Sequence, residues 1–318
     1  MNRGTLFESV GQMLDAHGLG EAEEEPMTTD GWSGAVHTRL VDAATGRRYV
    51  LKRTSLARDW IARATADTEL RESRFAASVG ADEAAPYVGA ALDGEGVAIL
   101  MPDLSDVLLP WDRPIDLATL EVILRAVAAL HADDGRAPRA VRAAPACPLD
   151  LRLTLLSEVA ARGYSAQGNP VGATFLRGWD AFRRHASAPA VALIDELATD
   201  VAPLTAALGL LPAVPLHGDL KLSNVALTTD SRVAFIDWQM LLVAPVAVDL
   251  GWFLVGNAAV LPVDPDVVLA QYRAAARTWA AEVDRDGWEA QVDLAMITGL
   301  LLRGWRKALD AEADVVYA

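Results

Sequence analysis

Asp219, Asn224 and Asp237 are the residues whose types and spacing point most clearly to chemistry. Asn224 follows Asp219 by five positions in the stretch Leu-His-Gly-Asp-Leu-Lys-Leu-Ser-Asn, and Asp237 ends a second stretch, Val-Ala-Phe-Ile-Asp. Asp219 can accept the proton of a substrate hydroxyl or orient that hydroxyl. Asn224 and Asp237 carry hard oxygen ligands, which suit a Mg²⁺ ion that bridges nucleotide phosphates. Lys221 is a compact positive charge that can reach a transferred phosphate, so the pattern favours phosphoryl transfer.

These two stretches resemble the catalytic loop and the metal-binding aspartate of the aminoglycoside phosphotransferase and choline kinase-like family, which shares the protein-kinase fold. The resemblance covers most of the chain, and five polar positions agree in order and spacing. It implies that Asp219 is the catalytic base, that Asn224 and Asp237 bind Mg²⁺, and that ATP is the phosphoryl donor. Lys221 stands where many relatives have histidine, and here the chain looks more like a protein kinase.

The same resemblance implies a lysine on a strand near the N-terminus. Lys52 ends the strand-like segment Tyr-Val-Leu-Lys, and strand alternation places it on the same face as Val50, which could contact an adenine ring. The chain contains only three lysines against 25 arginines, so a lysine here and another at position 221 give independent support. The alternative for Lys52 is a solvated side chain on an edge strand.

An acidic partner for Lys52 is expected on the helix that follows, where Glu69 and Glu72 compete. Glu72 shares an apolar stripe at helical spacing, and a carboxylate on such a stripe needs a partner. Arg71 and Glu72 also resemble the family's Arg-Glu pattern. We therefore favour Glu72, with Glu69 as the alternative.

Two weaker patterns concern the rest of the nucleotide. In the fold that the resemblance implies, the backbone N–H groups of the loop Gly-Trp-Ser-Gly at residues 31–34, which contains Ser33, would cover the phosphates. A bare hairpin turn explains the loop nearly as well. The segment 99–104, which contains Met101 and Asp103, resembles a hinge whose backbone binds adenine. The alternative for that segment is a buried strand that ends at a turn.

Three further polar residues are expected to be structural. We interpret His217 as a residue that organises the backbone beside Asp219. Asp249 resembles the family's buried aspartate at a helix start, which braces the catalytic loop, and a simple N-cap is the alternative. His131 matches a family helix pattern, but a packed core histidine explains it better.

The pattern of elements predicts an α+β protein with a protein-kinase-like two-lobed fold. Residues 1–104 are expected to form a small β-rich, nucleotide-binding lobe, and residues 105–318 a larger helical lobe with the catalytic loop and the acceptor pocket. The first lobe should contain a hairpin at 36–43 and 47–53, one helix at 57–79, and strands at 87–92 and 97–101. An acidic run at 21–25 is typical of a solvated face or a turn. In the second lobe, Asp116 is expected to cap a helix, and single helices are expected at 150–163 and 191–209.

Composition excludes several classes of protein. The 318 residues carry a net charge of −15, which argues against a nucleic-acid partner and against an anionic membrane surface. The longest uncharged stretch, 201–218, contains three prolines and is no membrane span. The single cysteine, Cys147, excludes a disulfide framework and a cysteine zinc site. The N-terminal segment lacks the apolar core of a signal peptide, so a cytoplasmic protein is expected. The oligomeric state is left open.

We therefore expect an ATP- and Mg²⁺-dependent phosphotransferase that acts on a hydroxyl of a small molecule, of the sugar, aminoglycoside or amino-alcohol class. A protein kinase would carry a long activation segment and an Ala-Pro-Glu motif after Asp237, but only eleven residues separate Asp237 from Asp249 and the motif is missing. The alternatives are a nucleotide-binding pseudokinase or scaffold without transfer activity, and a phosphatase-like role for the same aspartates.

Overall fold

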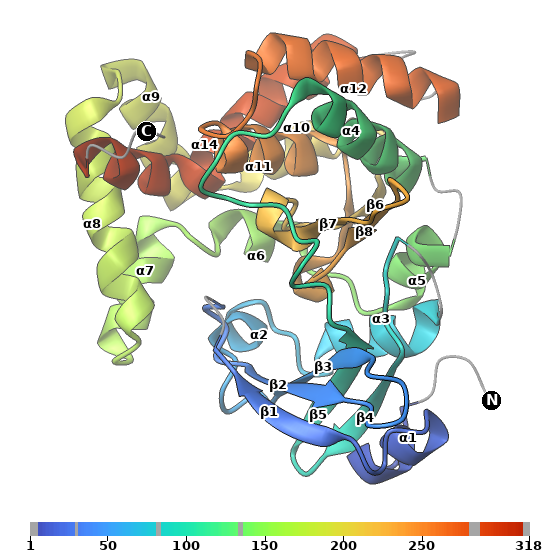
Figure 1. Cartoon of the computed structure of the whole chain (residues 1–318). Helices are drawn as coiled ribbons and strands as arrows, with labels where there is room; N and C mark the ends of the chain where they lie inside the picture. The colour runs from blue at the N-terminus through green and yellow to red at the C-terminus, as the bar shows by residue number, and fades with distance from the viewer. Residues whose placement is uncertain (1–5, 29–30, 81–83, 133–135, 280–286, 314–318) are drawn as a thin grey trace.

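The computed structural model describes residues 6–28, 31–80, 84–132, 136–279 and 287–313. A twisted sheet with three short helices forms one end of the molecule, and a larger assembly of helices forms the other (Figure 1). The α+β architecture expected from the sequence, with a smaller sheet-containing part and a larger helical part, is thus confirmed.

The sheet is antiparallel, with strand order β1-β2-β3-β5-β4. Its elements in chain order are α1 (Val10–Ala16), β1 (Glu23–Met27), β2 (Val36–Val41), β3 (Arg48–Thr54), α2 (Trp60–Ala64), α3 (Arg71–Val79), β4 (Gly89–Asp93) and β5 (Gly96–Pro102). The predicted hairpin of β2 and β3 is confirmed. The acidic run is part of edge strand β1, where Glu25 and Glu24 are exposed and approach Arg39 and Arg53 to 3.8 and 4.0 Å.

The prediction of one helix over 57–79 is wrong, because α2 and α3 are separate. Ala66 and Leu70 between them adopt left-handed backbone angles, with φ of 51° and 53°. Asp67 then accepts the backbone N–H of Arg71 at 2.9 Å, which satisfies a free donor in the first turn of α3. The apolar periodicity runs across this break, so the pattern alone conceals it.

The helical part is built from longer elements in chain order. These are α4 (Leu117–His131), α5 (Arg136–Ala143), α6 (Leu149–Thr154), α7 (Glu158–Ala166), α8 (Pro170–His185), α9 (Ala188–Thr199), α10 (Ala202–Leu208), α11 (Ala247–Asn257), α12 (Pro265–Trp279) and α14 (Trp288–Glu312). Asp116 caps α4 as predicted, accepting the N–H of Thr119 at 2.7 Å. The helices expected at 150–163 and 191–209 are each divided in two, by new N-caps or turns at Ser157 and 200–201.

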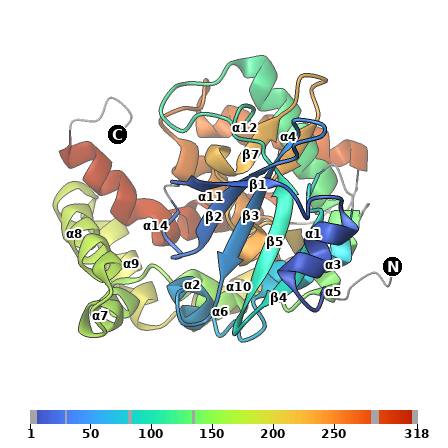
Figure 2. The same cartoon turned by 60° about the horizontal axis from the view of Figure 1, so that its bottom comes forward.

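Helices α7, α8 and α9 gather at one side of the helical part, next to the C-terminal half of α14, in both views (Figure 1, Figure 2). Among the described residues, no helix combines the length and the apolar character needed to cross a membrane.

Short strands fill the region between the two parts. They are β6 (Val214–Leu216) paired with β9 (Leu242–Ala244), and β7 (Val225–Leu227) paired with β8 (Val233–Phe235), together with the 3₁₀ turns η1 (Leu222–Asn224) and η2 (Trp238–Met240). Since β7 and β8 are antiparallel, the residue before β7 and the residue after β8 meet at one end of the pair. The N–H of Ile236 accordingly donates to the carbonyl of Asn224 at 2.9 Å.

A hydrophobic core joins the sheet to the helical part. Phe75 of α3 stacks on Trp238, with ring centroids 4.5 Å apart, and both side chains are fully buried. Helix α3 therefore packs directly on the residue that follows Asp237. The core thus fixes the distance between the sheet's polar residues and those of the segment 217–237.

Candidate active site

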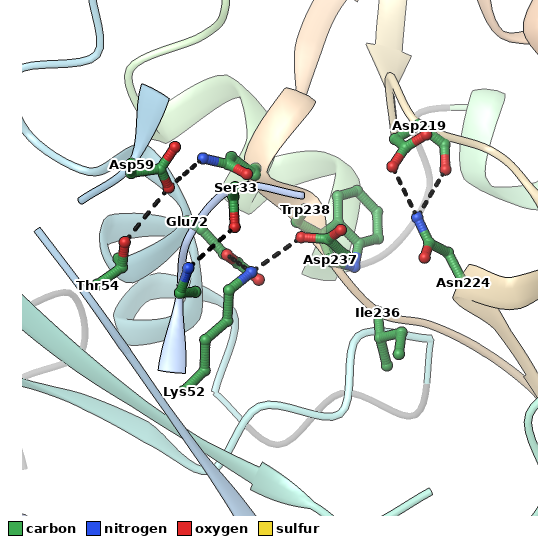
Figure 3. Close-up of polar contacts among 12 residues, drawn as sticks. Ser33, Lys52, Thr54, Asp59, Glu72, Asp219, Asn224, Ile236, Asp237 and Trp238 are labelled. Carbon is green, nitrogen blue, oxygen red and sulfur yellow. Dashed lines mark hydrogen bonds and ion pairs between the residues drawn. The ribbon is translucent and has the colours of Figure 1, made fainter. Parts of the chain in front are cut away.

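Lys52 of β3 lies between two carboxylates from distant parts of the chain (Figure 3). Its Nζ is 2.6 Å from Oε2 of Glu72 and 2.9 Å from Oδ1 of Asp237. The hydroxyl of Tyr87 donates to the other Glu72 oxygen at 2.7 Å. The predicted pairing of Lys52 with Glu72 is confirmed, whereas Glu69 is exposed and pairs with Arg74 outside the core.

The neighbouring charges in this cluster keep both Lys52 and Asp237 ionised. Burial alone lowers the pKa of Lys52, but the two carboxylates outweigh burial and hold that pKa above its ordinary value. Burial alone raises the pKa of Asp237, but the charges of Lys52 and Lys221 hold that pKa well below its usual range. Asp237 also adopts a left-handed backbone conformation, with φ of 64°, which turns its side chain toward the lysine.

Arg71 is a functional-site residue that sequence reasoning missed. Its guanidinium is fully buried and donates to the carbonyls of Gln239 and Pro145, both at 3.1 Å, and to Thr65 at 3.0 Å. These contacts tie α3 to the segment after Asp237. The Arg-Glu pair at 71–72 was the available signal, but it was used only for Glu72.

Asp219 lies on the other side of the site, on the loop between β6 and η1 (Figure 3). Its Oδ2 accepts from Nζ of Lys221 at 2.9 Å and from Nδ2 of Asn224 at 3.0 Å. Its Oδ1 is buried and has no hydrogen-bond partner among the described residues. A buried carboxylate oxygen without a donor is ready to accept one from a substrate hydroxyl.

Asn224 and Asp237 are brought to one end of the β7–β8 pair by the hydrogen bond between Asn224 and Ile236. The amide nitrogen of Asn224 is engaged with Asp219, which leaves its amide oxygen as the ligand atom. The described residues contain no group of three or more His, Cys, Asp or Glu side chains that could hold a metal. Two hard-oxygen side chains nevertheless fit Mg²⁺, because that ion commonly takes one or two protein oxygens and completes its shell with phosphate oxygens and water.

The comparisons with known proteins agree with this geometry. The model of the phosphotransferase enzyme family matches residues 29–288. The chain belongs to this family. It is accordingly a phosphotransferase that acts on small molecules. No protein of curated function matches it in sequence.

Solved structures show the protein-kinase-like fold of this phosphotransferase. A spectinomycin phosphotransferase, solved with ADP and spectinomycin, has a TM-score of 0.52 and 13% identity, over 91% of this chain and 81% of its own. An ethanolamine kinase from Plasmodium vivax has a TM-score of 0.53 and 12% identity, over 99% and 88% of the two chains. A choline kinase from Cryptosporidium parvum has a TM-score of 0.53 and 11% identity, over 92% and 84%.

The remaining residues predicted to contact the nucleotide lie on or beside the sheet of the phosphotransferase. Val50 of β3 and Met101 of β5 face each other across the strand pair, and both are buried. Ser33 is buried, and its hydroxyl accepts the N–H of Ala35 at 3.4 Å. The carboxylate of Asp103 is held by Arg39 at 2.7 Å and by the N–H of Ser105 at 3.0 Å. The side chain of Asp103 thus stabilises the turn after β5. The nucleotide-binding roles of these four residues stay predictions.

The carboxylate of Asp249 in α11 supports the backbone of the loop that contains Asp219. The two carboxylate oxygens accept the N–H groups of His217 at 2.9 Å and Gly218 at 2.8 Å. His131 lies 3.3 Å from the same carboxylate and 2.8 Å from the hydroxyl of Tyr272. Asp249 therefore braces the loop as predicted and is not a simple N-cap. His131 is a packed core histidine, as expected.

His217 organises the backbone, as predicted. Its Nδ1 accepts the N–H of Asp219 at 3.2 Å, so the ring proton lies on Nε2, which donates to the carbonyl of Ile236 at 3.0 Å. Burial disfavours the charged ring and lowers the pKa of His217 below 6.5, against the opposing charge of Asp249. The neutral ring links the catalytic loop to the residue before Asp237.

The lowered pKa of His217 predicts a loss of stability in acid. Below pH 6.5 the unfolded chain binds a proton at this residue that the folded chain does not, so the free energy of unfolding falls as pH falls toward the folded pKa. The contribution is at most about 1.4 kcal/mol per pH unit. The free energy of unfolding, measured with urea between pH 7 and pH 5, should fall less steeply with decreasing pH for His217→Asn than for wild type. The same pH dependence in both proteins would contradict the assignment.

Gly218 is expected to tolerate no side chain. Its φ is 82°, and a Cβ there would lie 1.9 Å from the carbonyl oxygen of Met240. Gly218→Ala should lower the free energy of unfolding by at least about 3 kcal/mol, since a backbone clash adds to strain of about 1–3 kcal/mol. Gly46→Ala is the matched control, because Gly46 has a φ of 69° but open space around it, and should cost about 1–2 kcal/mol. Equal losses in urea unfolding would argue against a tightly packed loop.

Proposed function

We propose that this phosphotransferase moves the γ-phosphoryl group of ATP to a hydroxyl of a small molecule. The proposal rests on the two carboxylate oxygens of Asp219. One oxygen is fixed by Lys221 and Asn224, and the other is buried without a partner among the residues that the structure describes. In this proposal residues 1–104 bind the nucleotide, and residues 105–318 hold the catalytic loop and the acceptor. A cytoplasmic location stays a prediction.

Each polar residue then has a role that follows from its contacts. The free Oδ1 of Asp219 accepts the hydrogen bond of the acceptor hydroxyl and orients its oxygen for attack. It takes the proton as the new P–O bond forms and the bond from the γ-phosphorus to the bridging oxygen breaks, which releases ADP. Lys221 holds the other oxygen of Asp219 in place and adds a positive charge beside the transferred group. Lys52, fixed by Glu72, presents its charge to the phosphates of the donor.

The amide oxygen of Asn224 and the carboxylate of Asp237 would hold Mg²⁺. The ion supplies neutralisation of the charge on the phosphate oxygens when it is bound. Asp237 is suited to this role because its lowered pKa keeps it ionised at neutral pH. The hydrogen bond between the backbones of Asn224 and Ile236 keeps the two ligands at one end of the hairpin.

An ADP-release screen tests the proposal. Purified protein with Mg²⁺ and ATP is assayed against sugars, aminoglycosides, amino alcohols and nucleosides, with Asp219→Asn as the blank. We expect at least one hydroxyl compound to stimulate ADP formation in wild type and not in the blank. Tight ATP binding without stimulation by any compound would instead favour a nucleotide-binding scaffold, and release of phosphate without ATP would favour a hydrolase.

A further inference from the structure

Two arginines line the side of the catalytic loop that faces α6, α11 and α14. Arg152 of α6 donates from Nε and Nη2 to the carbonyl of Gly218, at 3.0 and 2.7 Å, directly before Asp219. The guanidinium of Arg152 lies 4.3 Å from the ring centroid of Trp252, and that of Arg303 lies 4.9 Å from the same ring. Arg152 and Arg303 thus form a cationic surface near Asp219, which the sequence did not predict.

Two buried donors on this cationic surface lack an acceptor among the described residues. Nε of Arg303 and Nε1 of Trp252 are buried without a hydrogen-bond partner within the part of the chain that the structure describes. Arg306 and Lys307 on the same helix are paired with Asp310, at 2.8 and 3.3 Å, whereas the described residues give Arg303 no ion pair. Because buried donors in native proteins are almost always satisfied, these two groups are available to a hydrogen-bond acceptor from outside the chain.

The position of Arg303 places this partner on the acceptor side of the site. Arg303 packs on the ring of Trp252, and Arg152 on the same ring donates to the carbonyl directly before Asp219. Burial lowers the pKa of Arg303 to about 10, and the nearby charge of Asp219 opposes that shift, so the guanidinium stays charged at neutral pH. Arg303 therefore lies near the carboxylate expected to receive the hydroxyl.

We propose that the acceptor carries an oxyanion, a carboxylate or a phosphate, in addition to its reacting hydroxyl, and that Arg303 binds this group. The inference rests on the proposed function. A guanidinium presents several N–H donors in one plane and pairs with both kinds of oxyanion in a bidentate manner. A cationic acceptor would instead place like charges together, and an acceptor without an oxygen at this position would leave the Nε donor of Arg303 unpaired.

Sulfate binding tests the oxyanion site without knowledge of the acceptor. Thermal unfolding of the protein with Mg²⁺ and ADP bound is followed as sodium sulfate replaces sodium chloride at constant ionic strength. We expect sulfate to raise the Tm of wild type and of Arg306→Gln alike. Arg303→Gln should lose about tenfold or more in sulfate affinity, as expected for a lost hydrogen bond to a charged group. An identical sulfate response in all three proteins would overturn the proposal.

A size-matched acceptor panel gives a second test, which does not depend on the folding of a variant. ADP release by wild type is compared for glycerate, glycerol and serinol, and for glucuronate, glucose and glucosamine, which differ in charge but little in size. Glycerol 3-phosphate and glucose 6-phosphate distinguish a phosphate from a carboxylate. Preference for the anionic members supports the proposal. Preference for neutral or cationic members overturns it while leaving phosphoryl transfer intact, and failure of phosphoryl transfer itself would appear in the broader screen.

Discussion

Replacing Asp219 with asparagine is expected to lower turnover by about 10²–10⁴-fold while ATP affinity changes little. Asparagine keeps the shape of the side chain and can still contact Lys221 or Asn224, but it cannot take a proton from the acceptor hydroxyl. The loss therefore falls on the chemical step and not on nucleotide binding. Turnover is measured as ADP formed with the best acceptor of the screen, and ATP affinity by calorimetric titration.

Asp230→Asn is the matched control for this experiment. Asp230 lies in the exposed turn between β7 and β8 and contacts Thr228 and Arg232, so the same chemical change there should leave turnover unchanged. Full activity of Asp219→Asn would refute the assignment of the base. A large loss of ATP affinity in Asp219→Asn would show that the loop itself has moved.

Replacing Lys52 with methionine is expected to have the largest effect on stability. The change leaves Glu72 buried beside Asp237 without a cation, and breaking a buried pair costs about 3–5 kcal/mol. It also removes the charge proposed to hold the phosphates, so ATP affinity should fall together with the Tm. Urea unfolding and calorimetric titration measure the two losses separately.

The double variant Lys52→Met/Glu72→Gln separates the two effects. Neutralising Glu72 removes the unpaired buried charge, so the double variant should regain part of the lost stability but none of the ATP affinity. Arg53→Met on the same strand is the control, because Arg53 is half-buried and its contacts with Thr38, Asp93 and Glu24 lie at the periphery of the sheet. A double variant no more stable than Lys52→Met would show that the pair with Glu72 contributes nothing.

Much of the site was predictable because its chemistry is local in sequence. The spacing from Asp219 to Asn224 is set by one short loop. The family resemblance led to Lys52, and helix periodicity then favoured Glu72 over Glu69 as its partner. His217 was assigned its supporting role from its position beside Asp219, and Asp249 from its resemblance to the family's buried aspartate at a helix start. In each case the residue type within a short motif carried the information.

The missed features are long-range contacts between residues that no local pattern connects. Arg71 reaches carbonyls at Pro145 and Gln239, and Arg152 reaches Gly218 across 66 positions. A buried arginine and a solvated one look the same in a sequence with 25 of them. The break between α2 and α3 was missed for a related reason, since Leu70 adopts a left-handed conformation that its residue type does not favour.

The central claim is that Asp219, Asn224 and Asp237 act on one Mg²⁺-nucleotide complex. A crystal structure with Mg²⁺ and a non-hydrolysable ATP analogue tests it most directly. We predict that the Asp237 carboxylate and the Asn224 amide oxygen coordinate the ion, that Lys52 contacts the phosphates, and that the terminal phosphate faces the free oxygen of Asp219. A nucleotide bound elsewhere, or an ion that touches neither Asn224 nor Asp237, would contradict the account.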